Sequence, residues 1–359
     1  MISISLCMIV KNEEEVIERC LHSIQNVIDE IIIVDTGSTD RTKEICSKFT
    51  SNIYDYPWND NFSDARNYSF RFATMEYMMW LDADDIVLPE DNHKLQELKE
   101  NLDTSVTAVM MKYQSGKDPQ GNALLSYYRE RLVKRACNFK WCEPVHEYLE
   151  ISGNIINSEI IITHAKPPSI TQSSRNINIY EKMRSDGIAL SSRGTYYYAR
   201  ELKDHNRIPE AIIQFELFLN SGLGWKEDNI AACGELAKCY QLNHCPDMAL
   251  QTLFRSFVYD LPRAEICCQI GYWYKEKENY VSAAFWFKFI LSLKKPENSW
   301  GFLWLDCWDF VPLIECSVCY DRLGDYQKAE EYNNRALIIK PDSIPALNNK
   351  DYFNSLHKS

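Results

Sequence analysis

The sequence of 359 residues has no long hydrophobic run. A helix that spans a membrane needs about 20 consecutive apolar residues, and no segment of this chain approaches that length. The first segment, MISISLCMIV, carries no basic residue and is followed by Lys11, which is unlike a secretory signal. We therefore expect a cytoplasmic protein with no membrane span.

Positive charge is also scarce. The chain has 39 Lys and Arg residues against 51 Asp and Glu residues, a formal net charge of −12. Nucleic acids and anionic membranes are bound by basic surfaces, so we expect no nucleic-acid partner, although a local basic groove stays possible. Hydrophobic residues make up 45% of the chain, which is enough for two packed domains.

Cysteine is plentiful, but the motifs that would give it a covalent or metal-binding role are missing. The 13 cysteines are odd in number and scattered, and no export signal accompanies them. Cys316 and Cys319 form a single C-x-x-C within a predicted helix, without the second pair of a zinc site. We predict buried, reduced thiols that pack as small apolar side chains.

Apolar runs in the first half of the chain predict an α/β domain. Residues 3–10 and 31–35 are continuous and rich in β-branched side chains, as in buried parallel strands. Residues 13–27, between them, have apolar side chains at helical spacing. Further elements are predicted as helices near 40–49 and 63–75 and as strands near 53–55 and 78–82.

The alternation of strands and helices predicts a doubly wound sheet, in which ligands bind beyond the carboxyl ends of the strands. Asp35, Asp82 and Asp84 are expected at such ends. In WLDADD, Asp82 and Asp84 follow a predicted strand, and two carboxylates so placed are hard-oxygen ligands for Mg²⁺ or Mn²⁺. The alternative is an acidic loop that caps the following helix.

A recurring alanine replaces the strand pattern after residue 190. Its four copies are spaced by 38, 34 and 46 residues, and a proline follows each of the last three after 12 or 13 residues. This pattern resembles tetratricopeptide repeats, and LGDYQKAEEYNNRALIIKP (323–341) is the clearest copy. The long step implies an insertion, ENSWGFLWLDCWDF (297–310). The alanines are Ala211, Ala249, Ala283 and Ala329, and the prolines are Pro262, Pro296 and Pro341.

Four motifs in order carry a family resemblance: SLCMIVKNEE, VDTGSTDRT, FSDARN and WLDADD. Their series resembles the inverting family 2 glycosyltransferases with the GT-A fold. It is most similar to the subgroup with C-terminal tetratricopeptide repeats, which includes bacterial enzymes that glycosylate cysteine or serine of ribosomally made bacteriocin peptides. The resemblance implies a Rossmann-like nucleotide-sugar domain at 1–170, a linker and helix at 171–190, and an all-α repeat domain at 191–359. The Pro- and Ser-rich segment 166–176 is the expected linker.

The resemblance also implies residue roles. The uridine pocket would be lined by residues 8–13, with Asp35 and Asp40. For these two aspartates the alternatives are a turn and a helix N-cap. Asp84 would be the principal metal ligand, with Asp82 near the ribose or the metal. The nucleotide-binding set implied in this way is Val10, Asn12, Glu13, Asp35, Asp40, Arg66, Asn67, Asp82 and Ala83.

Two later segments complete the expected site. WCEPVHEYL (141–149) resembles a segment of the subgroup that ends in His-Glu, although Cys142 and Glu143 depart from its usual pattern. An inverting transfer needs a base for the acceptor proton, and Glu147 is the first candidate, with Glu143 and His146 as alternatives. His164, which ends the apolar run EIIITH, is expected either to join Asp84 on the metal or to be structural.

The insertion contains three tryptophans at intervals of four residues, a spacing that would place them on one face of a helix. They are expected to be core residues, an acceptor-binding wall or a dimer contact. These tryptophans are Trp300, Trp304 and Trp308.

The sequence thus predicts metal-dependent, inverting transfer of a hexose from a UDP-sugar, of which UDP-glucose is one. The acceptor would be a cysteine or serine of a peptide, Mn²⁺ or Mg²⁺ the cofactor, and a homodimer through the repeats is possible. One rival hypothesis is transfer to a saccharide or a lipid-linked saccharide. Another is an interaction protein whose α/β domain is degenerate.

Overall fold

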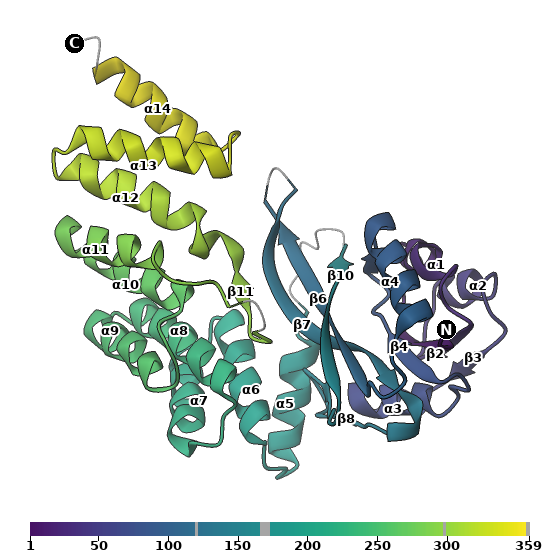
Figure 1. Ribbon diagram of the computed structural model, residues 1–359. Helices are drawn as coiled ribbons and strands as arrows, with labels where there is room; N and C mark the ends of the chain where they lie inside the picture. Colours follow the sequence, from purple (N-terminus) through teal and green to yellow (C-terminus); the bar gives the residue numbers. More distant parts are fainter. Residues whose placement is uncertain (119–120, 166–172, 297–298, 357–359) are drawn as a thin grey trace. The chain divides into compact units, whose positions relative to one another are not determined.

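The computed structural model describes residues 1–118, 121–165, 173–296 and 299–356 (Figure 1). Contacts divide the chain into two compact units. The first contains residues 1–116 and 126–189, and the second contains 117–125 and 190–359. The predicted domain boundary at residue 170 and most of the predicted linker lie outside the described residues. Helix α5 (Arg175–Ser185), which follows them, belongs to the first unit.

The first half of the sheet is parallel, as the sequence predicts. Strands β3, β2, β1 and β4 lie side by side in that order, and every pairing among them is parallel. Val10, the last residue of β1, lies opposite Asp35, the last residue of β2. The carboxyl ends of these strands therefore meet at one edge. The elements are β1 (Ile4–Val10), α1 (Ile17–Ile24), β2 (Glu30–Asp35), α2 (Thr42–Cys46), β3 (Ile53–Asp55), α3 (Phe62–Phe70) and β4 (Tyr77–Trp80).

The second half of the sheet is mixed, which the local sequence pattern did not predict. Strand β7 runs antiparallel to β4, and the order continues with β6, β10 and β5. Strand β10 is parallel to β6 but antiparallel to β5, a register that places His164 opposite Asp85. The remaining elements of the unit are β5 (Asp85–Val87), α4 (Pro89–Asn101), β6 (Ala108–Lys117), β7 (Ala123–Lys134), β10 (Ile155–His164) and the two-stranded sheet of β8 (Trp141–Cys142) and β9 (Tyr148–Leu149).

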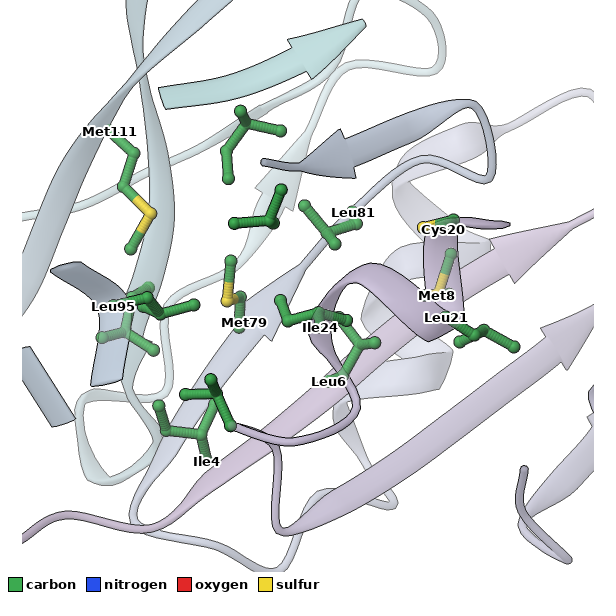
Figure 2. Close-up of a cluster of buried hydrophobic side chains, with 14 of the residues drawn as sticks. Ile4, Leu6, Met8, Cys20, Leu21, Ile24, Met79, Leu81, Leu95 and Met111 are labelled. Carbon is green, nitrogen blue, oxygen red and sulfur yellow. The ribbon is translucent and has the colours of Figure 1, made fainter. Parts of the chain in front are cut away.

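Two apolar layers cover this sheet. On one face, alternate residues of β1 pack against α1, α2 and α4, and Figure 2 shows Leu6 and Met8 of β1 near Leu21 and Ile24 of α1. On the other face, Cys7 and Trp80 belong to a second cluster, which includes side chains from the end of α3 and from β8. Because successive residues of a strand face opposite sides, β1 is buried on both faces.

The second unit consists of paired helices. Four pairs pack consecutively, α6 with α7, α8 with α9, α10 with α11 and α12 with α13, and α14 packs against α13. Each repeat alanine lies in the second helix of its pair with none of its surface exposed, which confirms the predicted repeats. The helices are α6 (Ser192–Asp204), α7 (Ile208–Ser221), α8 (Lys226–Leu242), α9 (Pro246–Arg255), α10 (Ala264–Glu276), α11 (Tyr280–Ile290), α12 (Phe310–Arg322), α13 (Tyr326–Ile339) and α14 (Ile344–Leu356).

The described part of the insertion, residues 299–310, does not form the tryptophan-lined helix that the spacing predicted. Trp304 ends the short strand β11 (Leu303–Trp304), which pairs with β7, and Trp308 ends a 3-10 turn. One oxygen of Glu265 in α10 accepts from the backbone N–H of Trp304 at 3.0 Å and from the indole of Trp308 at 2.8 Å. Trp308 is buried, whereas Trp300 and Trp304 are 37% and 47% exposed.

The thirteen cysteines form no disulfide. Nine are buried, and Cys316 and Cys319 lie within α12 as predicted. The four that are only half-buried are Cys137, Cys142, Cys245 and Cys307. Among the described helices, none is long and apolar enough to cross a membrane.

Candidate active site

The acidic loop between β4 and β5 is a tight turn closed at both ends. The backbone N–H of Asp85 donates to the carbonyl of Asp82 at 3.0 Å, and the N–H of Asp82 donates to Oδ2 of Asp85, also at 3.0 Å. The turn follows directly on the buried strand β4. It therefore fixes Asp82, Asp84 and Asp85 at the edge of the sheet where the parallel strands end.

Arg66 connects this turn to the expected base. The Arg66 side chain is almost fully buried, and it donates from Nη2 to Oδ1 of Asp82 and from Nε to Oε1 of Glu147, each at 2.7 Å. Its guanidinium also lies 4.8 Å from the ring of Trp80 and 4.9 Å from that of Trp141. Burial alone raises the pKa of Asp82, but Arg66 and Arg131 outweigh it and lower the pKa to about 2.

The segment that carries Glu147 is fastened to the start of α3. The N–H of Phe62 donates to the carbonyl of Pro144 at 2.8 Å, and the Ser63 hydroxyl donates to the carbonyl of Glu143. Glu143 and His146 adopt positive φ angles of 72° and 53°, which non-glycine residues rarely adopt. The three candidates for the base, Glu143, His146 and Glu147, thus lie in one constrained loop. Glu147 forms the ion pair with Arg66.

Helix α5 supports the same loop from another direction. Tyr180 is buried, its hydroxyl lies 3.5 Å from the carbonyl of Val145, and its ring is stacked near the imidazole of His146 at 6.4 Å between centroids. The arrangement gives His146 a structural partner from α5. Residues after the predicted boundary at 170 therefore help to shape the candidate site.

His164 lies beside the acidic turn. Its Nδ1 is 3.4 Å from Oδ1 of Asp84, 3.8 Å from Oδ1 of Asp85 and 2.8 Å from the Tyr113 hydroxyl. The carboxylate of Asp84, and after it that of Asp85, raise the pKa of His164 to about 9. Asp84, Asp85 and His164 form a group whose potential ligand atoms all lie within 4.8 Å of one another.

Several residues of the site were not among the sequence predictions. Asp85 is completely buried, and its Oδ2 lies 2.9 Å from Nη1 of Arg131 in an ion pair. The Arg131 guanidinium lies 3.8 Å from the centre of the Trp80 ring. Arg129 contacts the same ring at 4.8 Å. Arg129 and Arg131 are two residues apart in β7 and therefore lie on the same face of the strand. This spacing of two arginines is the sequence signal that could have identified them as site residues.

The expected uridine pocket is built from backbone turns. Asp35 is buried at the end of β2, and its Oδ1 accepts from the N–H groups of Gly37 and Ser38 at 3.0 and 2.9 Å. Its Oδ2 is buried and has no hydrogen-bond partner in the part of the chain that the structure describes. Asn12, with φ of 55°, accepts on its side-chain oxygen from the N–H of Thr39 at 2.8 Å. These contacts join the loops after β1 and β2.

Asp40 has a structural role whether or not it also contacts a ligand. Oδ1 accepts from the N–H and hydroxyl of Thr42, and Oδ2 accepts from the N–H of Glu14 at 3.1 Å. The N–H of Glu13 donates to the Thr42 hydroxyl at 2.7 Å. Burial acts to raise the pKa of Asp40, but its hydrogen bonds, chiefly those to Thr42, outweigh burial and lower the pKa.

The other residues expected to contact the nucleotide are either buried or bonded to the protein itself. Val10 and Ala83 are buried, at 3% and 5% exposure. The Asn67 amide both donates to the carbonyl of Trp141 and accepts from its N–H, each at 3.0 Å. Asn67 therefore fastens β8 to α3. Trp300, Trp304 and Trp308 belong to the second unit.

Part of the first unit is similar in sequence to known proteins. Residues 5–150 match the family described as Glycosyl transferase family 2. A TPR repeat-containing protein of Synechococcus elongatus is 33% identical over 156 residues, which are 42% of this chain and 36% of the relative. The SPbeta prophage-derived glycosyltransferase SunS of Bacillus subtilis is 33% identical over 114 residues, 31% of this chain and 27% of the relative. The chain thus matches only about a third of these relatives' lengths.

Solved structures resemble the chain more distantly. Glucosyl-3-phosphoglycerate synthase of Mycobacterium tuberculosis, in complex with Mn²⁺ and UDP-glucose, is 17% identical with a TM-score of 0.36, covering 53% of this chain and 81% of that one. The MamA protein is 15% identical with a TM-score of 0.36, covering 45% and 79%. The similarity to glycosyltransferases therefore rests on the sequence match of residues 5–150 to the family 2 model, and helix pairs of the kind found in tetratricopeptide repeats follow this segment.

Proposed function

We propose that the protein transfers a hexose from a UDP-sugar, with inversion, to a cysteine or serine side chain of a peptide, and that the transfer depends on Mn²⁺ or Mg²⁺. The observation that carries the proposal is the chain of contacts Asp82–Arg66–Glu147, each joined at 2.7 Å. Through Arg66, the acidic turn expected at the leaving group is linked directly to the carboxylate expected at the acceptor.

The proposed chemistry is a single displacement. A lone pair of the acceptor oxygen or sulfur attacks the anomeric carbon, while the bond from that carbon to the diphosphate oxygen breaks and its electrons leave with UDP. Glu147 takes the acceptor proton as the new bond forms. Arg66 holds Oε1 of Glu147 at 2.7 Å and thereby fixes the direction of the carboxylate. Glu143 and His146, in the same loop, are the alternative bases.

The side chains beside the turn suit a divalent cation. Carboxylate oxygens and a neutral imidazole are suitable ligands for Mn²⁺, and Oδ1 of Asp84 and Nδ1 of His164 lie 3.4 Å apart. A cation here would offset the negative charge that develops on the diphosphate. The unpartnered Oδ2 of Asp35 provides an acceptor for the N–H of a uracil ring.

The helix pairs support a peptide acceptor. Stacked helical repeats present extended surfaces that bind peptides, and the exposed rings of Trp300 and Trp304 are of the type that anchors a peptide. A saccharide or lipid-linked saccharide is the second candidate acceptor. A scaffold without activity is a weaker candidate, because Arg66, Asp82 and Glu147 remain paired in a buried site.

The test is to incubate the pure protein with several UDP-sugars and Mn²⁺ and to measure the release of free UDP. We expect release with at least one sugar, and its loss after EDTA treatment or in Asp84→Ala. The scaffold hypothesis instead requires that no UDP-sugar is consumed and that UDP does not bind by calorimetry. Metal-independent turnover would contradict the cation requirement alone.

A further inference from the structure

The identity of the carboxylates that hold the cation depends on where each oxygen points. Three potential ligand atoms converge, one each from Asp84, Asp85 and His164, all within 4.8 Å of one another. Asp82, the first acid of the D-x-D motif, is not in this group. Its Oδ1 is already engaged at 2.7 Å by the buried guanidinium of Arg66.

Asp85 has one oxygen engaged and one without a hydrogen bond. Its Oδ2 accepts from Arg131 at 2.9 Å and from the N–H of Asp82 at 3.0 Å. Its Oδ1 is completely buried, accepts no hydrogen bond from the residues that the structure describes, and has an ionic contact of 3.8 Å with Nδ1 of His164. A buried carboxylate oxygen without a hydrogen bond is unfavourable, so this atom marks a place for a positively charged ligand.

We propose that the cation is held by Asp84, Asp85 and His164, with Asp85 in place of Asp82. This assignment rests on the cation requirement of the proposed function but replaces the ligand expected from the motif. Ligand atoms at right angles on a cation, each at about 2.1 Å, are about 3.0 Å apart, and opposite ones about 4.2 Å. The separations of 3.4 and 3.8 Å from Nδ1 of His164 fall within that range.

The surroundings of Asp85 are those of a supported ligand. Carboxylates that bind metals are usually oriented by hydrogen bonds from a second layer of residues, and Arg131 and the Asp82 N–H supply these to Oδ2. The Tyr113 hydroxyl is bonded to Nδ1 of His164 at 2.8 Å, and a cation at Nδ1 would replace that hydrogen bond.

A division of work between the two ends of the acidic turn follows. Asp82 orients Arg66, and through Arg66 the Glu147 carboxylate, while Asp84 and Asp85 bind the cation. Substitution of Asp82 should therefore impair transfer without lowering the affinity for the cation. Substitution of Asp85 should lower the affinity for the cation, and transfer should be lost because the cation is no longer bound.

The experiment measures Mn²⁺ binding to the full chain without any sugar donor, by the EPR signal of free Mn²⁺, at one fixed pH. We expect Asp85→Asn to weaken Mn²⁺ binding by 10-fold or more, because its amide nitrogen replaces the free oxygen beside His164. Asp82→Asn can still accept from Arg66 and should stay within about 3-fold of the wild type. Tyr113→Phe, which removes the competing hydroxyl, should bind Mn²⁺ at least as tightly as the wild type.

The opposite ranking, with Mn²⁺ lost in Asp82→Asn and kept in Asp85→Asn, overturns the assignment, as does a wild type that binds no Mn²⁺. Circular dichroism melts must show that each variant is folded. If Asp85→Asn does not fold, Asp82→Asn decides the matter alone, because retained binding supports the assignment and lost binding overturns it. Absence of UDP release would contradict the proposed function and leave this result unaffected, since no donor is present.

Discussion

At the scale of single residues, the two oxygens of Asp35 differ in a way that predicts base selectivity. Oδ1 accepts two backbone N–H groups and cannot exchange places with Oδ2 without losing both. In Asp35→Asn, Oδ1 keeps these bonds, so a donating amide must replace the free Oδ2. A uracil N–H would then face another donor, whereas cytosine presents an acceptor at that position.

We therefore expect Asp35→Asn to weaken UDP binding by about 10- to 100-fold, the effect of one unpaired buried polar group, and to strengthen CDP binding, because the amide can donate to the cytosine acceptor. Calorimetric titration of both nucleotides with the wild type and the variant checks this. If UDP and CDP weaken equally, Oδ2 of Asp35 does not contact the base.

Glu147 gives a second prediction at this scale, because glutamine can still accept from Arg66 but cannot take a proton. Glu147→Gln should keep the affinity for the UDP-sugar and lower transfer by about 10²- to 10⁴-fold. A thiol acceptor ionises more easily than a hydroxyl and should lose less activity. Donor affinity by calorimetry and turnover by UDP release are the two measurements. If Glu147→Gln turns over as fast as the wild type, Glu147 is not the base. Glu143 and His146 would then be substituted and assayed in turn.

The residue types of the site could be predicted from the motifs, but several partners could not. Asn67 was expected near the nucleotide, yet both ends of its amide are bonded to Trp141, 74 residues away. Asp85 stood in the same acidic motif as Asp82 and Asp84, but the motif does not show that its carboxylate pairs with Arg131 in another strand. Contacts of this kind are set by the sheet order, which a local pattern does not contain.

At the scale of elements, the helix pairs depend on small residues where two helices cross. A Cβ added to Gly271 of α10 would lie 2.7 Å from the completely buried ring of Phe287 in α11. At Gly234 of α8, the nearest atoms would be flexible side-chain ends at 3.0 and 3.2 Å. The two glycines therefore differ in how much room they leave.

We expect Gly271→Ala to lower the free energy of unfolding by about 1–3 kcal/mol through overpacking, partly offset by the better helix propensity of alanine, about 1 kcal/mol. Gly234→Ala, the matched control, should be neutral or slightly stabilising. Urea denaturation of both variants measures the difference. Equal stability of the two would mean that Phe287 has room to move.

Glu235 of α8 predicts a dependence of stability on pH. Burial alone raises the pKa of Glu235, but Lys238 and Lys203 outweigh it and lower the pKa to about 2. The unfolded value is about 4.3, so the ion pairs stabilise the fold above that pH and lose their effect as the pH falls toward 2. The greatest possible contribution is about 3 kcal/mol.

The wild type should accordingly exceed Glu235→Gln in stability at pH 7, and the difference should shrink steadily between pH 5 and pH 2.5. Urea denaturation at several pH values compares the two proteins. A difference that does not change over this range would show that Glu235 has an ordinary pKa in the folded state.

The insertion shows where element prediction fails. A spacing of four residues between tryptophans fits a helix, but Glu265 accepts from the backbone of Trp304 and fixes a different path. Gly301 adds to this, because a Cβ there would lie 2.5 Å from Glu227. The repeat alanines were predicted correctly because the same local packing recurs with every pair.

At the scale of the whole molecule, the first unit extends to residue 189. The sequence predicted an N-terminal domain at 1–170 and a linker and helix at 171–190. Helix α5, within the latter segment, belongs to the first unit, and its Tyr180 contacts the loop of Glu143 to Glu147. The antiparallel half of the sheet likewise could not be predicted, because it pairs residues such as Met79 and Leu132 that lie far apart in sequence.

A fragment of residues 1–189 should therefore melt cooperatively, bind UDP with Mn²⁺ and hydrolyse the sugar donor slowly, whereas a fragment of residues 1–165 should lack a cooperative melt. Neither should modify a peptide acceptor at concentrations where the full chain does. Circular dichroism and UDP release test the two fragments side by side. Efficient acceptor modification by the 1–189 fragment would show that the helix pairs serve assembly and not acceptor binding.

The distribution of thiols has a practical consequence for spectroscopy. Nine of the thirteen cysteines are buried, so maleimide dyes should react first with the four half-buried ones. Cys142 adjoins the loop that carries Glu143 and Glu147, and burial raises the pKa of its thiol, so its labelling should quicken in mildly alkaline buffer. With Cys137, Cys245 and Cys307 changed to serine, a fluorophore on Cys142 would report movements of that loop in real time, without the introduction of any new cysteine.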